Sequence, residues 1–441
     1  MMSRTRRCFL LACLLSGLFA AQAAVRSLTI LHVNDLHARL LPDPDHRGGF
    51  AYLVSAIRQE EKGCRSCLLL NAGDLVQGTP VSTIFQGLPV YEIGNLFHFD
   101  VSTLGNHEFD YGWEMVPKFL AKARFPVVSA NLTDASGRLI AGRPYLFRKV
   151  NGIRVAVIGL VMEDLARLTT PDKMGPWRAQ PVIETLRKYV AEVREQSDLI
   201  VALAHVNDRE AEQILHQVPE VAVVVSGHNH TGLKAAQEIE RRVNVRVDGY
   251  GRELGRLDLR VNVGERRLES WIWKRIPVNT SAFAPAADMA AQVAHWEAQV
   301  SQRVDVPIGE SRREIAGPEL RSMLEQAMAA EVGADFGFLN AGGVRDKIPQ
   351  GRLLARHIWN LMPFDDRVMV GKFRGSELPD VVKEGRQIDP NRTYRLAVTD
   401  FTAANQGERS QLRAHGMQFP ESGPLLRDLL IAWIRKKQVL P

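Results

Sequence analysis

The stretch Ser102–Gly112, STLGNHEFDYG, joins an apolar run to a dense set of polar side chains. The run Val101–Leu104 predicts a buried strand that ends at Gly105. Four polar residues follow almost together: Asn106, His107, Glu108 and Asp110. Burying polar groups is unfavourable unless they are bonded. We therefore expect these side chains to bind a ligand at the end of the strand.

The same alternation of apolar runs and amphipathic segments extends from about residue 27 to residue 277. The apolar runs predict buried strands: LTILHVND, CLLLNAGD, VSTLGN, PVVSANL, VAVIGLV, LIVALAHV and VAVVVSGHNH. The amphipathic segments predict helices: FAYLVSAIRQEEK, WEMVPKFLAKA, VIETLRKYVAEVREQ and REAEQILHQV. Residues 243–278 predict antiparallel strands with turns at DGYG and VGERR. This pattern indicates an α/β fold.

Five of the predicted strands deliver a polar residue at their end: Asp35, Asp74, Asn106, His205 and His228. In open α/β sheets, ligands collect at the carboxyl ends of the strands. Asp35 and His37 are two residues apart, so both can face one side of an extended segment. The same holds for His228 and His230. Carboxylate, imidazole and amide ligands suit Zn, Mn, Fe, Co or Ni. A carboxylate such as Asp74 can bridge two of these ions.

Each motif has a simpler interpretation when it is taken alone. A lone GD is most often a turn, and NDLH can form an Asx turn. GNHE can start a helix that Asn106 caps. A lone histidine at a strand end is more often a hydrogen-bonded core or surface residue. These interpretations must hold independently at every position, whereas one metal site explains all the positions together.

The ordered set NDLH, GD, GNHEFD, a single His and GHNH resembles the calcineurin-like metallophosphatase superfamily. With SGHNHTG, NAGGVRDKIP and PF added, the chain resembles the exported bacterial 5′-nucleotidase family. The resemblance implies an N-terminal metallophosphoesterase β-sandwich flanked by helices. It also implies a second, smaller α/β substrate-binding domain, joined by a helical linker. The implied reaction is hydrolysis of phosphate esters, nucleotides above all, by a hydroxide that two metal ions activate.

The resemblance also assigns roles to the polar residues. One metal would be held by Asp35, His37, Asp74 and His230, and relatives often carry Gln in place of the last of these. The other metal would be held by Asn106, His205 and His228, with Asp74 bridging. The two divalent ions would be Zn, Mn, Co or similar. His107 and Asp110 match the catalytic pair, in which the carboxylate orients the imidazole and the cationic ring stabilises the transition state. Glu108 has no role in this scheme, and we expect it at solvent or in a local salt bridge.

In the second domain, the resemblance implies a substrate pocket. Arg345 after AGG and Arg374 in KFRGSEL match arginines that contact substrate, and guanidinium groups suit phosphate. Phe401 in TDF matches one of two rings that hold the nucleoside base. The Gly-Gly-Asp run of relatives is replaced by ANQGE, where Glu408 stands one position off, and PFGN is replaced by PFDD. The stretch between Arg374 and Phe401 is too short to carry the second ring. These departures weaken nucleotide selectivity more than the metal and phosphate contacts.

The 441 residues favour more than one domain. We divide them into a signal peptide at 1–24, a metallophosphoesterase domain at 25–278, a linker and connecting helix at 279–306, and a shortened 5′-nucleotidase-type domain at 307–441. A basic start, the apolar CFLLACLLSGLFAA and the small-residue end AQAA predict export to the periplasm, with no stable membrane insertion after cleavage. Cys64 and Cys67 then remain, and they predict a small disulfide or idle thiols.

Charge and motifs limit the partners. Formal net charge is +6, and three of these charges lie in the leader, so nucleic acid is not expected as a partner. We expect a small-molecule phosphate ester and a monomer or weak dimer. One alternative keeps the metal chemistry but acts on a non-nucleotide ester, a cyclic diester, a nucleotide sugar or a sulfur-containing substrate. Another is a non-catalytic periplasmic binding protein. The pair His107 and Asp110 argues against the latter, because a purely structural metal site does not need it.

Overall fold

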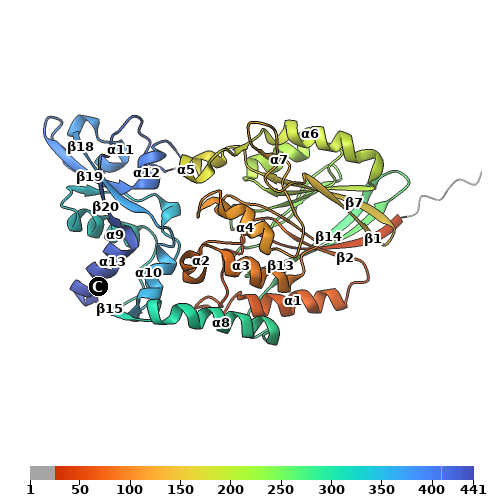
Figure 1. Ribbon diagram of the computed structural model, residues 1–441, viewed down its shortest axis with the longest axis horizontal. Coiled ribbons are helices and arrows are strands. Elements are labelled where there is room, and N and C mark those ends of the chain that lie inside the picture. Colours follow the sequence, from red (N-terminus) through yellow and green to blue (C-terminus); the bar gives the residue numbers. More distant parts are fainter. Residues whose placement is uncertain (1–24, 409) are drawn as a thin grey trace, which may run out of the picture.

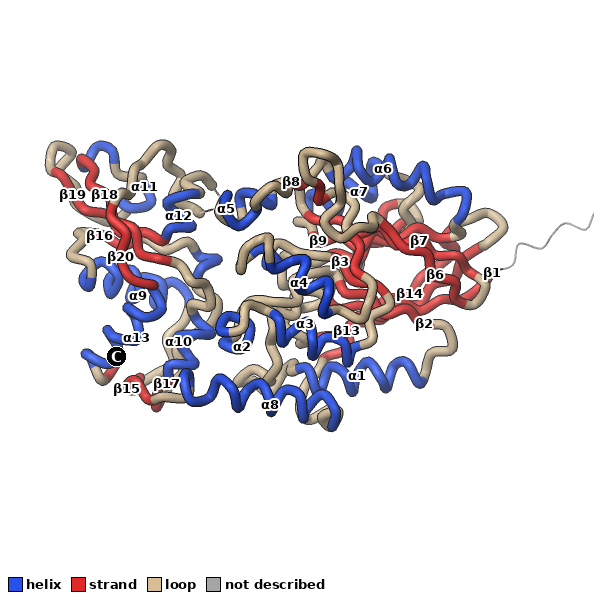
Figure 2. Tube along the Cα trace, viewed as in Figure 1, coloured by secondary structure: helices blue, strands red, loops and turns tan. Residues whose placement is uncertain are grey.

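A computed structural model describes residues 25–408 and 410–441, which form two α/β domains (Figure 1). The predicted signal peptide at 1–24 lies outside the described residues. Two six-stranded sheets face each other in the first domain, and the second domain has two smaller sheets with helices around them (Figure 2). The prediction of a β-sandwich domain followed by a smaller α/β domain is confirmed. Within the described ranges, no helix has both the length and the apolar character needed to cross a bilayer.

The first sheet has a parallel centre and an antiparallel edge. Its strands, in spatial order, are β14 (Arg267–Pro277), β13 (Glu253–Asn262), β1 (Val25–Val33), β2 (Cys67–Asn71), β3 (Val101–Thr103) and β4 (Val127–Val128). β1 to β4 are parallel, and β13 pairs antiparallel with both β1 and β14. Leu28 and Ile30 of β1 pack towards the other sheet, whereas Leu31 and Val33 pack under the helices. Both faces are buried, which explains why the run is continuously apolar.

The second sheet also has a parallel centre. Its strands, in spatial order, are β11 (Gln237–Ile239), β12 (Arg242–Val245), β10 (Val223–Ser226), β9 (Leu199–His205), β7 (Ile153–Val161) and β6 (Tyr145–Val150). β12, β10, β9 and β7 are parallel, and the edge strands are antiparallel. A separate short pair is formed by β5 (Leu132–Thr133) and β8 (Arg178–Ala179).

Helices cover the outer faces of the sandwich. Those on the first sheet are α1 (Phe50–Lys62), α2 (Pro80–Ile84), α3 (Leu88–Gly94) and α4 (Met115–Lys122); those on the second are α6 (Val182–Val193) and α7 (Asp208–Gln217). The short 3₁₀ helices are η1 (Asn95–Phe97), η2 (His107–Phe109), η3 (Leu165–Arg167) and η4 (Arg194–Gln196). α1 has the bounds that its amphipathic pattern predicts. α5 (Pro171–Met174) lies in an arm that reaches towards the second domain (Figure 1).

The segment predicted as a run of antiparallel strands is divided between the two sheets. VGERR is the hairpin turn between β13 and β14, as expected. DGYG is not a hairpin turn, because β12 pairs in the second sheet and β13 in the first. The chain crosses from one sheet to the other at this point. The crossing carries Tyr250 past the carboxyl ends of the central strands.

Helix α8 (Ala287–Val304) follows the sandwich and leads into the second domain (Figure 1). One small sheet has the order β17 (Gly351–Leu354), β15 (Pro307–Ser311), β21 (Val439–Leu440). The other has the order β16 (Phe336–Gly337), β19 (Thr393–Thr399), β18 (Arg367–Arg374), β20 (Glu421–Leu425). The remaining elements are α9 (Gly317–Glu331), α10 (Ala355–Leu361), α11 (Asp380–Lys383), α12 (Asp400–Ala404), α13 (Leu426–Lys437), η5 (Ala341–Gly343) and η6 (Gly375–Glu377).

A disulfide joins Cys64 and Cys67 at the start of β2, so the thiols are not idle. This is one of the two states that the C-x-x-C spacing left open. The bond closes the turn between α1 and the strand that leads to Asp74. It therefore restrains a connection at the amino-terminal end of β2, whereas the candidate site lies at the carboxyl end of that strand.

Candidate metal centre and substrate cavity

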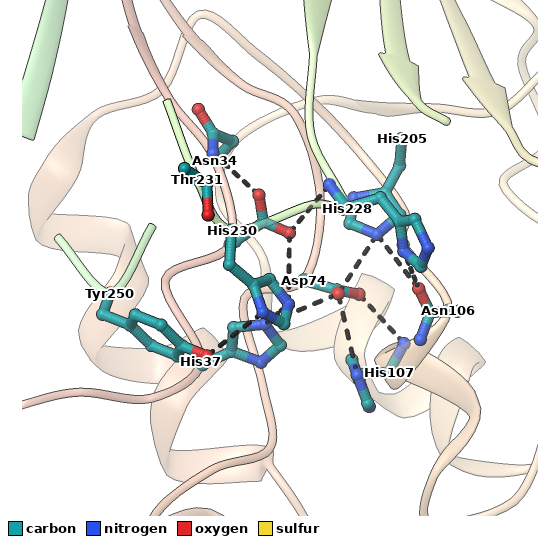
Figure 3. A network of polar contacts seen from close by, with 12 residues as sticks. Asn34, His37, Asp74, Asn106, His107, His205, His228, His230, Thr231 and Tyr250 are labelled. Atoms are coloured by element: carbon teal, nitrogen blue, oxygen red, sulfur yellow. Dashed lines mark hydrogen bonds and ion pairs between the residues drawn. The ribbon is translucent and has the colours of Figure 1, made fainter. Parts of the chain in front are cut away.

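The carboxyl ends of β1, β2 and β3 in the first sheet and of β9 and β10 in the second lead into loops whose polar side chains lie together (Figure 3). The structure brings together there all seven side chains predicted as metal ligands. Two groups of them have potential ligand atoms within 4.8 Å of one another: His37, Asp74, His107 and His230, and Asp35, Asp74 and His205. Asp74 belongs to both groups. The cluster is therefore arranged around a shared carboxylate, as the sequence predicts.

The loops that carry these side chains have an unusual backbone. Five of the predicted ligands have a positive φ: Asp35 (53°), His37 (47°), Asp74 (53°), His228 (80°) and His230 (57°). Left-handed conformations are uncommon for residues other than glycine and store about 1–3 kcal/mol each where they occur. Hydrogen bonds between the loops hold this geometry, among them the one from the His37 N–H to the Asp74 carbonyl at 3.0 Å.

Asp74 lies at the centre of the cluster and is fully buried. Its Oδ1 accepts the backbone N–H of His107 at 2.9 Å. Its Oδ2 lies 3.1 Å from His205 Nε2 and 3.6 Å from His37 Nε2, on opposite sides (Figure 3). Burial acts to raise the pKa of Asp74, but His205 and His107 hold that pKa well below its ordinary value. An ionised carboxylate thus stands between the two halves of the site.

The first half of the site is built on two facing imidazoles. His37 Nε2 lies 2.9 Å from His230 Nε2. Burial lowers the pKa of both rings, to about 2 for His230. At this distance, at most one of the two facing Nε2 atoms can carry a proton. The other Nε2 atom therefore presents a lone pair to the site. Asp35 Oδ1 lies 3.9 Å from His230 Nε2. This is the donor arrangement that a divalent cation requires.

Tyr250 fixes the orientation of His230. Its hydroxyl lies 3.1 Å from His230 Nδ1, which leaves Nε2 pointing towards His37 (Figure 3). The Tyr250 N–H also donates to the Asp35 carbonyl at 2.6 Å. Outer partners of this kind commonly orient histidines that bind metals. Tyr250 was not identified from the sequence, because DGYG was interpreted as a hairpin turn.

The second half of the site contains Asn106, His205 and His228. Asn106 Oδ1 lies 3.1 Å from His205 Nε2 and 3.0 Å from His228 Nδ1. His205 Nδ1 donates to the Ala72 carbonyl at 2.8 Å, so Nε2 faces Asn106 and Asp74. Burial lowers the pKa of His205, but Asp74 outweighs this effect and raises it to about 9. The carboxylates therefore attract positive charge to this position, which a cation would supply. The residues of both halves fit a pair of divalent ions.

His107 and Asp110 form the pair that the sequence indicates. His107 Nδ1 donates to Asp110 Oδ2 at 2.7 Å. Burial lowers the pKa of His107, but Asp110 and Asp74 outweigh it and raise that pKa. The neighbouring carboxylates thus shift this ring towards the protonated form. Its Nε2 lies 4.0 Å from Asp74 Oδ2, at the edge of the metal cluster.

The expectation for Glu108 was wrong, because this side chain is fully buried rather than at solvent. Its Oε2 accepts the N–H of Gly105 at 2.5 Å and that of Asp74 at 3.3 Å. Its Oε1 accepts the N–H of Leu75 at 2.9 Å. Glu108 therefore joins the loop after β2 to the loop after β3. Sequence reasoning missed this role because charged residues are usually exposed.

We expect the substitution Glu108→Gln to destabilise the fold. Glutamine has nearly the same shape, but its amide group cannot accept hydrogen bonds at both ends, so a buried N–H loses its partner. The expected loss is about 1–3 kcal/mol of unfolding free energy. Urea denaturation in the presence of a chelator measures it without a contribution from metal. Glu92→Gln, at an exposed glutamate of α3, is the matched control. Equal midpoints for both variants would contradict the role of Glu108.

A cavity of about 930 Å³ opens in front of the cluster, and both domains line it. The structure places Arg345 and Phe401 on its wall. The Arg345 guanidinium lies 5.7 Å from the ring of Phe364, and that ring lies 6.0 Å from the ring of His107. Among the described residues, Arg345 Nη2 is buried without a hydrogen-bond partner. Phe364 belongs to the PF motif, which was the sequence signal for it.

Arg374 is not among the described residues that line the cavity, and its contact with substrate stays a prediction. β18 begins near the cavity wall, where Val368 pairs with Thr399, and it ends at Arg374, which pairs with Thr393. Eight residues of strand separate the two ends by about 24 Å. Glu408 is exposed, and it is absent from the described lining of the cavity, so it does not take the place of the aspartate in the Gly-Gly-Asp run of relatives.

Comparisons with known proteins agree with this architecture. Residues 28–232 match the family model of calcineurin-like phosphoesterases, and residues 293–387 match that of the 5′-nucleotidase C-terminal domain. A protein named UshA from Yersinia enterocolitica is 26% identical and covers 85% of each chain. A 5′-nucleotidase of Vibrio cholerae is 26% identical and covers 86% of this chain and 84% of its own.

A crystal structure of a 5′-nucleotidase precursor from Thermus thermophilus has the same fold. It superposes with a TM-score of 0.85 and 23% identity, covering 94% of this chain and 97% of the other. Together with the His/Asp cluster, the matches identify a metal-dependent phosphoric ester hydrolase that uses two divalent ions. The chain thus combines a segment that matches the calcineurin-like phosphoesterases with one that matches the 5′-nucleotidase C-terminal domain.

Proposed function

We propose that this protein hydrolyses phosphate monoesters of small alcohols, with nucleoside monophosphates as the first candidates. The observation that carries the proposal is the cluster around Asp74, with the pair His107 and Asp110 beside it at the floor of a two-domain cavity. The relatives named as 5′-nucleotidases support the choice of nucleotides. A role limited to binding would leave the orienting hydrogen bond of His107 without a purpose.

We assign the metal ligands in two sets. Asp35, His37 and His230 would hold one ion, Asn106, His205 and His228 would hold the other, and the carboxylate of Asp74 would serve both. The neutral imidazole pair and the left-handed loops support the first set. The attraction of positive charge to His205 supports the second. Zn, Mn, Co or a similar ion suits these donors.

The bound ions supply polarisation of the phosphoryl group and activation of a water molecule. The protein's own contribution starts with Asp110, which accepts from His107 Nδ1 and leaves the protonated Nε2 free for a phosphoryl oxygen. A positive ring at this place stabilises the charge that develops in the transition state. Arg345 Nη2, which has no partner in the described part of the chain, is placed to bind a second oxygen of the phosphate. Phe401 offers a ring to the alcohol part of the ester.

Tyr250 is expected to tune one of the two metal positions. The substitution Tyr250→Phe keeps the ring, which packs 5.3 Å from that of His230, and removes only the hydroxyl. The loss of such a partner typically weakens metal affinity by about 10–100-fold. Metal titration followed by calorimetry should show one weakened site and one unchanged site. Tyr52→Phe, at a partly buried tyrosine of α1 outside the site, is the control. Two unchanged sites would contradict the orienting role of Tyr250.

Turnover of an aryl phosphate with added Mn or Co tests the proposed function. We expect a chelator to abolish it and either ion to restore it. A panel of AMP, a cyclic nucleotide, a nucleotide sugar and a nucleoside-free ester then distinguishes the monoesterase from the alternatives. Hydrolysis of AMP and of the nucleoside-free ester, with little of the other two, supports the proposal. No metal-dependent turnover of any of them would exclude catalysis and favour a binding protein.

We also propose that the protein is exported through the leader at 1–24 to the periplasm. The disulfide between Cys64 and Cys67 supports this, because disulfides persist in oxidising compartments. In this scheme, residues 25–278 carry the metals, residues 279–306 connect, and residues 307–441 bind the substrate. Nucleic acid is not among the proposed partners. A monomer or weak dimer stays a prediction.

A further inference from the structure

The cavity is lined by more acidic than basic side chains. Near the metal cluster, Arg345 is a positive group, and the ring of His107 pairs with the carboxylate of Asp110. The described lining also contains six carboxylates and only one lysine. The carboxylates are Asp110, Glu114, Asp172, Asp365, Asp366 and Asp400. Three of these come from the second domain, on the wall that carries Phe401, so the alcohol part of an ester would meet an acidic surface.

Two of the three wall carboxylates have defined partners. Asp365 Oδ1 pairs with Arg427 at 2.6 Å. Asp400 Oδ1 accepts the N–H of Phe401 at 2.9 Å, which leaves its other oxygen available. Asp366 differs, because no hydrogen bond or ion pair of its carboxyl group is found among the described residues. Burial and then the charge of Asp400 raise the pKa of Asp366 to about 7. A positively charged partner, or one that donates hydrogen bonds, would stabilise the ionised form of this carboxyl group.

Asn340 provides a second, independent sign of a ligand. It lines the same cavity and is only 7% exposed. Its backbone carbonyl accepts the N–H of Gly343 at 3.0 Å, whereas its side-chain amide has no hydrogen-bond partner in the described ranges. This side chain is therefore set to bond a polar group that enters the cavity.

We propose that the wall formed by Asp366, Asp400 and Asn340 selects esters whose alcohol part donates hydrogen bonds or carries positive charge. The same wall rejects esters whose alcohol part is anionic. The inference rests on the proposed function and names the substrate class of that site. Donors can come from an ammonium group or from neighbouring hydroxyls, as in a ribose or a polyol. A second phosphate or a carboxylate on the alcohol part would face like charges at short range in a partly desolvated cavity.

The residues of the wall differ from those that bind the phosphate, which explains why the wall does not exclude the ester phosphate itself. In the proposed function, Arg345 and the metal cluster bind the ester phosphate, whereas Asp366, Asp400 and Asn340 remain for the alcohol part. Lys173, on the arm of the first domain, lowers the pKa of Asp366 but forms no ion pair with it among the described residues. Lys173 therefore neutralises the negative charge of the acidic wall only in part. Nucleoside monophosphates, whose alcohol is a neutral diol, remain within the selected class.

Three small esters that differ mainly in the charge of the alcohol test the proposal: choline phosphate, glycerol 1-phosphate and 3-phosphoglycerate. We expect kcat/KM of the metal-loaded protein for the anionic ester to be at least about tenfold lower than for the better of the other two. The double substitution Asp366→Asn with Asp400→Asn should reduce this ratio to within about threefold, chiefly through KM. Asp380→Asn, at a fully exposed carboxylate of α11, should leave the ratio unchanged.

The outcomes show whether the wall binds a cation or hydroxyl groups. They also distinguish failure of this inference from failure of the proposed function. Preference for choline phosphate assigns the wall to a cation, and preference for glycerol 1-phosphate assigns it to hydroxyls; both support the inference. Equal kcat/KM for all three esters, or an unchanged ratio in the double variant, overturns it while aryl phosphate turnover keeps the proposed function intact. Absence of turnover on every ester, the aryl phosphate included, overturns the proposed function and this inference with it.

Discussion

The substitution His107→Ala is expected to lower kcat by about 10²–10⁴-fold while both metal ions remain bound. His107 donates to Asp110 at 2.7 Å, and Asp110 and Asp74 raise its pKa against the opposing effect of burial, which shifts the ring towards the protonated form. Alanine removes the positive group that faces the phosphate and leaves the seven assigned ligands in place. The loss should therefore fall on kcat more than on KM.

Elemental analysis and steady-state kinetics on the same sample measure this effect. His216→Ala, on the exposed face of α7, is the matched control and should behave as wild type. Activity that depends on a cationic His107 should fall as pH rises through its raised pKa, and this limb should vanish in the variant. His107 also lies in one of the two groups with metal-ligand spacing. Loss of one metal equivalent would therefore show that His107 is a ligand and refute the role assigned to it.

The substitution Asp74→Asn is expected to have the largest effect on metal content. Asp74 approaches imidazoles of both halves, at 3.1 Å and 3.6 Å, and is the one carboxylate common to both groups. An amide removes the bridging charge, so we expect fewer than two ions per chain. Metal ions contribute several kcal/mol to transition-state stabilisation. At about 1.36 kcal/mol per factor of ten, turnover should fall by roughly 10³-fold or more.

Metal stoichiometry after dialysis, followed by turnover at increasing Mn or Co, measures the result. Asp45→Asn, at an exposed carboxylate of the first domain, is the control. High concentrations of metal should restore only part of the activity, because the bridge itself is missing. Two tightly bound ions and normal turnover in Asp74→Asn would refute the proposed site at its centre.

Much of the fold follows from the sequence because the strands are buried on both faces. Their runs are continuously apolar, and the polar residues begin where each run ends. The parallel centre of each sheet then places Asp35, Asp74, Asn106 and His205 at a common edge. This explains why the gathering of these residues could be predicted without coordinates. The pairing of β12 could not be predicted in the same way, because a turn motif does not say which sheet its strands join.

The errors concern residues whose role depends on tertiary contacts. Glu108 is buried because three N–H groups from two loops converge on it, and no local pattern records that convergence. Tyr250 reaches His230 only because the chain crosses between the sheets. Packing decides where a side chain points and how deeply it is buried. A short sequence motif specifies neither of these.

The left-handed turns at Asp35, His37, Asp74, His228 and His230 also decide which mutants are informative. Alanine at these positions removes a donor atom and at the same time tolerates the turn poorly, so a loss of function mixes chemistry with misplaced backbone. Asparagine and glycine adopt such turns more readily. A scan with asparagine, with glycine as its partner at each position, would therefore separate what the side chain does from what the loop shape does.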